Sequence, residues 1–179
     1  GSFRGLQNGQ PVTIDTVASR TQKVLDDHTI QVINKDWIFN GHPLQMTQTY
    51  SVLPNSRDLL VEIKLDGYQQ DDEFCTGIQK LESDNQGFIS SEGRAASWGS
   101  NIPDKNHPEI VEQVGLGIIV DPSNVVSTEE SDLNYLVKVR PDKDGMIRYR
   151  VIACGDREKN GFSGYQDWSK YIKSLKYTD

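Results

Sequence analysis

Aromatic, basic and acidic side chains gather in the polar segment 93–108, and these residue types suit carbohydrate recognition. Trp98 offers a flat indole face that can stack on a sugar ring, while Arg94 and Asp104 can hydrogen-bond hydroxyl groups or a carboxylate. We therefore interpret Trp98, Arg94 and Asp104 as candidate ligand-binding residues. The competing interpretation places Trp98 in the core at the end of a strand and makes His107 an ordinary loop residue.

Lys80 is a basic residue on a strand face that is otherwise apolar or uncharged. The alternation of the sequence predicts that its side chain shares one face with Phe74, Thr76 and Ile78. A buried charge without compensation is costly, so we expect Lys80 to have a carboxylate partner or to open onto a ligand cleft. A position at the edge of the sheet is the alternative.

The segment 156–167 carries oxygen-bearing side chains at a spacing similar to that of an EF-hand calcium loop. The candidate ligands are Asp156, Glu158, Asn160 and Asp167. Glu158 stands where Asp or Asn is usual, Ser163 where an apolar residue is usual, and Asp167 where a bidentate Glu is usual. A strand rather than a helix is expected before this segment. We therefore favour a solvated loop, and we expect neither a metal nor another cofactor.

Other catalytic and binding motifs are absent from the sequence. The three histidines have no metal-ligand spacing, and no phosphate-binding glycine loop or Gly-x-Ser-x-Gly elbow occurs. Gly115 and Gly117 lie in an apolar strand, where glycine indicates close backbone approach or a bulge. Cys75 and Cys154 could pair across strands, but burial as small apolar side chains is the favoured interpretation.

Strands make up most of the elements that must position these side chains. Residues 59, 61, 63 and 65 are apolar while Glu62 and Lys64 point the other way, as in a half-buried strand. Seven further runs are similar but less regular: 28–39, 44–53, 74–81, 89–98, 114–120, 133–140 and 146–154. Strands that follow one another with no helix between them predict an all-β, antiparallel β-sandwich rather than parallel βαβ units.

Turns, loops and one helix complete the expected fold. Asn40-Gly41 and Asp144-Gly145 have the sequence of tight hairpin turns, so each is expected to join the strands on either side of it. Ser163 and Gln166 have the spacing of a capping box, and the apolar periodicity that follows predicts a C-terminal helix over about 163–176. Long polar loops, where function is often found, are expected at 103–108 and 121–132.

Charge and hydropathy argue against a nucleic-acid partner and against a membrane-spanning segment. The 179 residues include 26 Asp and Glu against 19 Lys and Arg, a formal net charge of −7. Nucleic acid is disfavoured, because polyphosphates are bound mainly by clustered Lys and Arg. No apolar run approaches the roughly 18 residues that a membrane span requires. Gly1-Ser2 resembles the remnant of an expression tag, so we expect a single domain over 3–179.

The order of several segments resembles a known family. These segments are Trp37-Ile-Phe-Asn-Gly-His-Pro-Leu, Met46-Thr-Gln-Thr-Tyr-Ser-Val-Leu, Arg57-Asp-Leu-Leu-Val-Glu-Ile, Phe74-Cys-Thr-Gly-Ile-Gln-Lys80, Ala96-Ser-Trp-Gly99, Val114-Gly-Leu-Gly-Ile-Ile-Val120 and Asp167-Trp-Ser-Lys-Tyr-Ile172. Together they resemble the domain-of-unknown-function 4861 family of secreted Bacteroides-type proteins, whose members usually sit in polysaccharide-utilisation systems. Members are generally longer at the N-terminus, so the chain resembles their C-terminal part, and a missing N-terminal domain is an expected partner.

The resemblance implies a fold, a setting and a ligand, but no catalytic motif. The implied fold is a sandwich similar to those of sugar mutarotases and of the C-terminal domains of polysaccharide lyases. The implied setting is periplasmic or extracellular, and the implied ligand is a plant or algal polysaccharide or oligosaccharide. Lyase chemistry on a uronate would need a cation beside the carboxylate, for which Arg94 or Lys80 is suitable. It would also need a base near the acidic proton, for which His107 or Tyr50 is suitable.

Two functions follow as hypotheses. The first is a secreted protein that binds or processes a polysaccharide, with Trp98, Arg94, Lys80 and His107 nearest the ligand. If that protein is an enzyme, it is a polysaccharide lyase or another carbohydrate-active enzyme. The second is a non-catalytic structural or scaffolding domain of a larger carbohydrate-active protein. Basic and aromatic side chains that converge in a groove would favour the first hypothesis, and an exposed apolar face or open sheet edge would favour the second.

Overall fold

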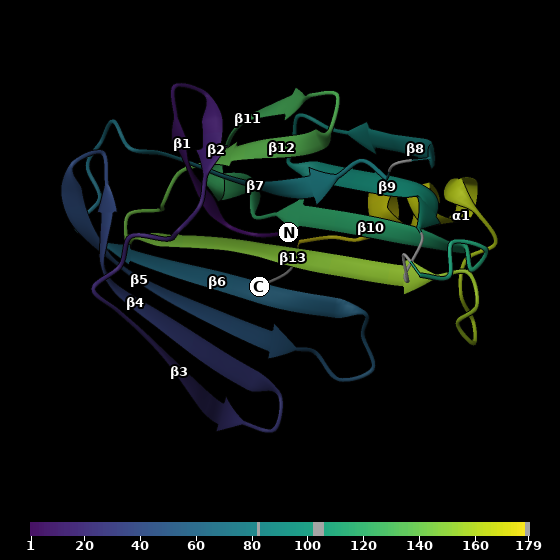
Figure 1. Ribbon diagram of the computed structural model, residues 1–179, viewed down its shortest axis with the longest axis horizontal. Coiled ribbons are helices and arrows are strands. Elements are labelled where there is room, and N and C mark those ends of the chain that lie inside the picture. The colour runs from purple at the N-terminus through teal and green to yellow at the C-terminus, as the bar shows by residue number, and fades with distance from the viewer. Residues whose placement is uncertain (82, 102–105, 178–179) are drawn as a thin grey trace.

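Two antiparallel sheets and one α-helix form the architecture of the computed structural model, which describes residues 1–81, 83–101 and 106–177 (Figure 1). The five-stranded sheet has the order β11-β12-β7-β1-β2 and consists of β1 (Arg4–Gln7), β2 (Gln10–Val12), β7 (Glu73–Gln79), β11 (Val125–Glu130) and β12 (Asn134–Val139). The eight-stranded sheet has the order β3-β4-β5-β6-β13-β10-β9-β8. Its strands are β3 (Ser19–Asp26), β4 (Thr29–Phe39), β5 (His42–Val52), β6 (Asp58–Asp66), β8 (Ser83–Ile89), β9 (Arg94–Asn101), β10 (Glu112–Val120) and β13 (Met146–Gly155). The expectation of an all-β sandwich with one C-terminal helix is confirmed.

The main core lies between the two sheets. Trp37, Phe39 and Phe74 are almost fully buried there, and the ring centroids of Phe39 and Phe74 are 5.5 Å apart. Alternation along each strand sends neighbouring side chains to opposite faces, so Ile118 of β10 enters this core while Ile119 points the other way. The eight-stranded sheet therefore needs apolar cover on both faces where β9 and β10 lie.

Helix α1 (Tyr165–Ser174) supplies the cover on the second face and forms a smaller core there. Gly115 and Gly117 make this approach possible. A Cβ atom on Gly115 would lie 2.8 Å from the Trp168 ring, and a Cβ atom on Gly117 would lie 2.6 Å from Ile172. The Trp168 indole Nε1 also donates a hydrogen bond of 3.1 Å to the carbonyl of Leu116. The prediction of close approach at these glycines is confirmed.

The Asn40-Gly41 prediction is correct and the Asp144-Gly145 prediction is wrong. Asn40 and Gly41 have φ values of 49° and 84° and join the paired strands β4 and β5. Asp144-Gly145 also forms a turn, in which the Asp142 amide donates to the carbonyl of Met146. The strands before and after it are β12 and β13, which lie in different sheets. The dipeptide thus predicts the local turn correctly, but the turn joins strands of two different sheets.

Other boundaries differ from the predicted ones for identifiable reasons. The run 89–98 is divided between β8 and β9 by a turn that contains Gly93, whose φ is 79°. The expected loop 121–132 holds a 3₁₀ turn (Pro122–Asn124) and β11. The helix is capped by the backbone of Gly164 rather than by Ser163, whose hydroxyl instead donates to Asp167. Strand β3 was not predicted because all eight of its residues are exposed, which removes the apolar alternation.

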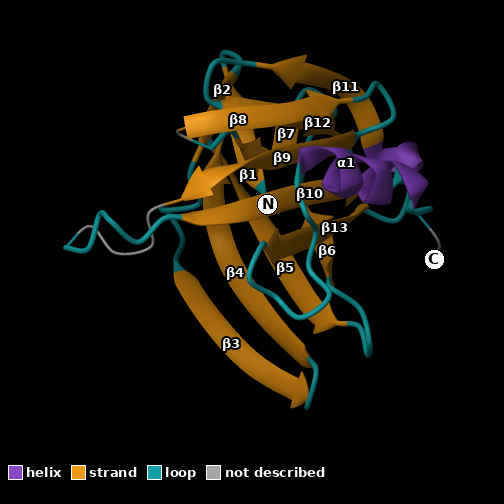
Figure 2. Cartoon of the chain, turned by 90° about the vertical axis from the view of Figure 1, so that its right-hand side faces the viewer, coloured by secondary structure: helices purple, strands orange, loops and turns teal. Residues whose placement is uncertain are grey.

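The eight-stranded sheet extends beyond its smaller neighbour at the β3 side, where β3 and β4 curve away from the five-stranded sheet (Figure 2). Val24, Ile30, Tyr50 and Val61 lie opposite one another on four adjacent strands and so share the core-facing side. Exposure rises outward along this row, from 1% at Val61 to 39% at Ile30 and 72% at Val24. The five-stranded sheet therefore leaves part of an apolar face without cover.

Two further predictions concern the state of the cysteines and the presence of a membrane-spanning segment. Cys75 and Cys154 are free and buried, one in each sheet, as the favoured interpretation held. Burial raises the pKa of each thiol to about 11, so both remain protonated at neutral pH. In the described part of the chain, no helix has the length and apolar character that crossing a bilayer requires.

Candidate functional site

Trp98 and Arg94 both serve the attachment of α1. Trp98 is 5% exposed and lies in the smaller core with Trp168 and Ile172. The structure therefore agrees with the interpretation of Trp98 as a core residue and not as a ligand-binding residue. The Arg94 guanidinium donates hydrogen bonds of 2.9 Å and 2.6 Å to the carbonyls of Lys173 and Leu175. These are carbonyl groups at the C-terminal end of the helix, which have no partner within the helix. The indole face and the guanidinium fork are therefore engaged within the protein.

Lys80, His107 and Tyr50 lie in separate surroundings, and Asp104 lies outside the described residues. The Lys80 ammonium is 2.8 Å from Glu130, which confirms the expected carboxylate partner. His107 is exposed and its Nδ1 lies 3.1 Å from a Glu109 oxygen. Among the described residues, no hydrogen bond, ion pair or ring contact joins any two of Tyr50, Lys80, Arg94, Trp98 and His107.

Tyr50 has the wrong electrostatics for a general base. Its ring is half-buried on β5, and burial raises the pKa of its hydroxyl, while the nearby Arg20 cation acts in the opposite direction. A general base works best when its pKa lies near the operating pH. At neutral pH the Tyr50 hydroxyl is therefore a hydrogen-bonding group rather than a phenolate.

The segment with calcium-loop spacing is held by protein contacts. Glu158 forms an ion pair with Arg57 and accepts a 2.7 Å hydrogen bond from the amide of Gly155. Arg57 also donates to the carbonyl of Asn160 at 3.0 Å. The Asp167 carboxylate accepts from the Ser163 hydroxyl. Within the described ranges, no group of three or more His, Cys, Asp or Glu side chains is arranged to hold a metal ion, and Asp156 is exposed.

A different site forms at the end of the sheet where β6 ends and β13 begins. These strands pair antiparallel, with Lys64 opposite Met146, so the loop that follows Asp66 lies beside the loop that precedes Met146. The loops are residues 67–72 and 140–145, which are far apart in the sequence. Sheet pairing therefore brings the two loops to the same end of the sheet.

Asp72 fixes the first of these loops. Its side chain is 1% exposed and its oxygens are fully engaged. They accept hydrogen bonds from the Asn40 side chain at 2.9 Å and the Gln69 amide at 2.8 Å, and lie 3.0 Å from His42 Nε2. The loop is thus bound to the hairpin turn between β4 and β5, which holds the residues between Gly67 and Asp72 in place.

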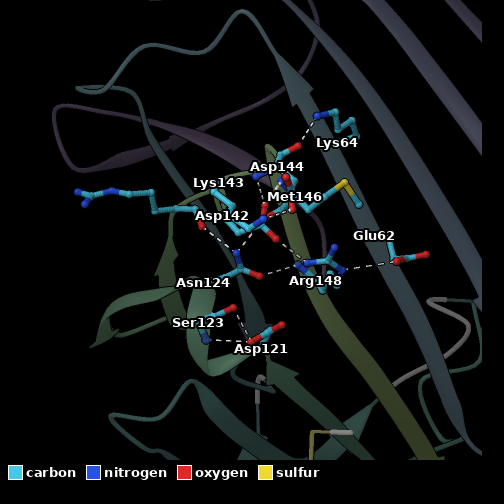
Figure 3. Close-up of polar contacts among 11 residues, drawn as sticks. Glu62, Lys64, Asp121, Ser123, Asn124, Asp142, Lys143, Asp144, Met146 and Arg148 are labelled. Atoms are coloured by element: carbon cyan, nitrogen blue, oxygen red, sulfur yellow. Dashed lines mark hydrogen bonds and ion pairs between the residues drawn. The ribbon is translucent and has the colours of Figure 1, made fainter. Parts of the chain in front are cut away.

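Asn124 fixes the start of the second loop from the inside (Figure 3). It is 1% exposed, and its amide donates hydrogen bonds of 2.9 Å to the carbonyls of both Arg140 and Met146. Its side-chain oxygen accepts from the Arg148 amide at 3.0 Å. A single buried side chain therefore joins the end of β12 to the start of β13.

Asp142 fixes the turn itself, as Figure 3 also shows. Its carboxylate accepts from the amides of Asp144 and Met146 at 2.8 Å and 2.9 Å, and from the Arg148 guanidinium at 2.7 Å. Burial alone would raise the pKa of Asp142, but these three donors outweigh it and lower that pKa. The carboxylate is therefore charged at neutral pH and holds the loop in one conformation.

Between the two loops lies a cleft of about 440 Å³, called the arginine cleft here. It is lined by Tyr68, Gln69, Gln70, Asp72, Arg140 and Pro141. The Tyr68 ring is half-buried and packs on the main core, while Gln69, Gln70 and Arg140 are exposed. In the described chain, the Tyr68 hydroxyl and the side-chain amides of both glutamines have no hydrogen-bond partner. The cleft thus offers polar groups that the protein itself does not use.

Arg140 differs from every other arginine of the protein. All eight arginines lie in the described part of the chain, and seven of them donate hydrogen bonds to other residues: Arg4, Arg20, Arg57, Arg94, Arg148, Arg150 and Arg157. Among the described residues, the Arg140 guanidinium has no hydrogen-bond or ion-pair partner. In a chain with excess acid, this leaves one guanidinium available to a ligand.

A second cleft of about 440 Å³ shares Tyr68 with the first and is called the lysine cleft here. It is lined by Lys64, Leu65, Asp66, Gly67, Tyr68, Lys143, Asp144 and Gly145. Here cations and carboxylates alternate, since Lys64 lies 3.5 Å from Asp66 and Lys143 lies 3.5 Å from Asp144. Lys64 also donates to the carbonyl of Asp144. Tyr68 therefore stands between a cleft with a free cation and a cleft with balanced charge.

Comparison with known proteins gives one match. A family model described as Domain of unknown function (DUF4861) matches residues 1–178. The chain belongs to this family. No curated protein and no solved structure matches the chain. The match confirms the family that the sequence segments indicate and nothing about its setting or ligand. The site of this DUF4861 protein therefore rests on its own geometry.

Sequence reasoning did not identify the residues of the arginine cleft. One signal was available, because the polar run from Gly67 to Asp72 follows the most regular strand of the chain. Arg140 stands before Pro141 at a strand end and gives no comparable signal. Its proximity to Tyr68 follows only from the pairing of β6 with β13. That pairing joins strands which are not neighbours in the sequence, so no local pattern encodes it.

Proposed function

We propose that this protein binds a carbohydrate chain, and that the arginine cleft is the binding site. The observation that carries the proposal is the set of polar groups around Tyr68 that have no partner among the described residues, above all the guanidinium of Arg140. Sugar sites combine an aromatic face for the C–H surface of the ring with a few amides or charged groups for its hydroxyls. Tyr68, Gln69, Gln70 and Arg140 supply this combination in one cleft.

The fixed loops support the proposal. A ligand site gains affinity when its groups are held in place before binding, because less conformational entropy is then lost. Asp72 and Asn124 are both nearly inaccessible to solvent and use their side chains to hold the two loops that bear the cleft. The cleft residues are thus placed by neighbouring buried groups, and their own side chains stay available.

The proposal includes the setting implied by the resemblance. The ligand is a plant or algal polysaccharide or an oligosaccharide derived from it. The protein is secreted, in the periplasm or outside a bacterial cell, and acts in a polysaccharide-utilisation system. The net charge of −7 disfavours long-range attraction of acidic polymers, so recognition depends on the local cation in the cleft.

The test is calorimetry on a panel of neutral and uronate-containing plant and algal polysaccharides, with absorbance recorded for the unsaturated uronates that a lyase would release. We expect heat of binding for at least one glycan, and a loss of at least tenfold in affinity for Tyr68→Ala. His107→Ala is the control, because its exposed side chain lies outside the cleft. Binding that survives Tyr68→Ala but not His107→Ala would refute the site.

A structural or scaffolding role is the second candidate, and the uncovered face beyond the five-stranded sheet favours it. Val24, Ile30 and Val52 expose large apolar surface at this end of the sheet, where another folded domain of a larger carbohydrate-active protein would pack. If the protein is a scaffold, Val24→Lys with Ile30→Lys would improve its solubility and abolish association with that domain, while no glycan would bind. Glycan binding unchanged in this double variant would favour the first candidate.

A further inference from the structure

We infer that the ligand is acidic and that the protein reads two consecutive sugar units of it, one on each side of Tyr68. This inference rests on the proposed function and adds the substrate class and the order of the units. The acidic unit occupies the arginine cleft with its carboxylate on Arg140. The next unit, which is uncharged, occupies the lysine cleft.

The charges of the arginine cleft select a carboxylate. The planar guanidinium of arginine matches a carboxylate through two parallel N–H donors, a geometry that lysine lacks. The one carboxylate among the residues that line this cleft is Asp72, and Asn40, His42 and Gln69 already satisfy it. Asp72 therefore neither neutralises Arg140 by pairing with it nor presents a free oxygen to the ligand.

The charges of the lysine cleft select an uncharged unit. Lys64 has a carboxylate and a backbone carbonyl as partners, and the Lys143 ammonium has Asp144. An added carboxylate here would meet Asp66 and Asp144 as well as the two lysines. Alternating donors and acceptors instead match the hydroxyl groups of a neutral sugar, each of which donates and accepts.

Tyr68 sets the spacing between the two units. It lines both clefts, and its ring is held against the main core while its hydroxyl has no partner in the described chain. A ligand that fills only the arginine cleft has no contact with Lys143, whose side chain is 89% exposed. A chain that continues past Tyr68 reaches it. Affinity should therefore rise when the ligand grows from one unit to two.

The experiment uses a defined oligosaccharide in which glucuronate alternates with a neutral hexose, together with its carboxyl-reduced counterpart. We expect the wild-type protein to bind the acidic form at least tenfold more tightly than the reduced form, since charge-assisted hydrogen bonds contribute that much. Arg140→Gln should bring this ratio close to one. Arg157→Gln is the matched control, because it removes the same charge from an exposed arginine outside both clefts.

Chain length provides the second measurement. Lys143→Ala should weaken binding of the acidic disaccharide and longer chains about two- to fivefold, and leave the affinity for glucuronate alone unchanged. Equal binding of acidic and reduced chains by the wild-type protein would overturn the inference while leaving the proposed function in place. A preference that Arg140→Gln leaves intact would also overturn it. No binding of any glycan on the wider panel would instead overturn the proposed function.

Discussion

Two regions of the eight-stranded sheet have similar residues in different roles. In one region these residues hold the helix, and in the other they line clefts. Beneath α1, Arg94 and Trp98 are both engaged, the first with helix carbonyls and the second in a core. At the β6–β13 end, Arg140 and Tyr68 have similar kinds of side chain, but they line clefts rather than pack beneath a helix. The guanidinium has no partner and the aromatic hydroxyl is free within the described chain.

The difference between the two regions lies in what covers the sheet. A helix end presents carbonyl groups without partners, and an arginine nearby satisfies them. In the two cleft loops, the buried side chains of Asp72 and Asn124 already form hydrogen bonds with backbone groups. The Arg140 guanidinium is therefore not needed for that purpose. Residue type therefore indicates a binding group only after the needs of the surrounding backbone have been met.

The largest effect is expected from Trp98→Ala in the helix-covered region. Removing a buried indole should lower the free energy of unfolding by about 3–5 kcal/mol, because a cavity remains between the sheet and α1. Urea unfolding measures this loss, and Trp98→Phe should recover part of it. At a temperature where the variant is folded, its glycan affinity should equal that of the wild type. A stable variant that fails to bind glycan would move the ligand site back to Trp98.

A smaller effect is expected from Arg94→Ala. The substitution removes two hydrogen bonds from a charged donor to the carbonyls of Lys173 and Leu175, and should cost about 1–2 kcal/mol of unfolding free energy. Arg94→Lys should recover only part, because a flexible ammonium is less pre-organised than the planar guanidinium whose Nη1 donates both bonds. Urea unfolding again measures the change. Unaltered stability would mean that the helix end does not depend on this side chain.

The smallest effect on the free energy of unfolding is expected from Asp142→Asn in the loop 140–145, and this effect should depend on pH. The pKa of Asp142 is lowered in the folded protein, so its carboxylate contributes stability above its ordinary pKa of about 3.9 and loses that contribution as the pH falls through the lowered value. The variant should be less stable by about 1 kcal/mol at pH 7. The difference from wild type should shrink in acid.

Urea unfolding from pH 7 to pH 2.5 follows this difference. Asp144→Asn is the control, because the Asp144 carboxylate is largely exposed and lies 3.5 Å from the ammonium of Lys143. A gap between wild type and Asp142→Asn that stays constant with pH would show that the Asp142 charge does not hold the turn. Reduced glycan affinity in Asp142→Asn would show that the conformation of this turn matters for binding in the lysine cleft.

The sequence predicts the fold wherever burial leaves a periodic pattern. Leu59 to Leu65 alternates because β6 is covered on one face, and the prediction agrees with the structure to within one residue at each end. Strand β3 has no buried face and therefore no pattern. The Asp144-Gly145 turn was recognised, but which strands it joins depends on the distribution of strands between two sheets. Local chemistry does not contain that information.

The candidate site was harder to predict than the fold, for a physical reason. Trp98 and Arg94 have the residue types of a sugar site, yet α1, about 70 residues later in the chain, covers them. A carboxylate partner for Lys80 was one of the alternatives predicted, because a charge on an apolar face needs either a partner or access to a cleft. Arg140 is identified by having no partner, and such an absence becomes visible only when all neighbours in space are known.

Amide hydrogens in strand β3 should exchange with solvent by a different route from those in the centre of the same sheet. In the described part of the chain β3 pairs only with β4, and all eight of its residues are exposed. Detaching it therefore breaks one ladder of hydrogen bonds and uncovers almost no apolar surface. Strands β6 and β13 pair on both sides and contribute Ile63 and Tyr149 to the main core. Exchange in β3 therefore reports the local opening of one strand, whereas exchange in β6 reports the unfolding of the whole sandwich.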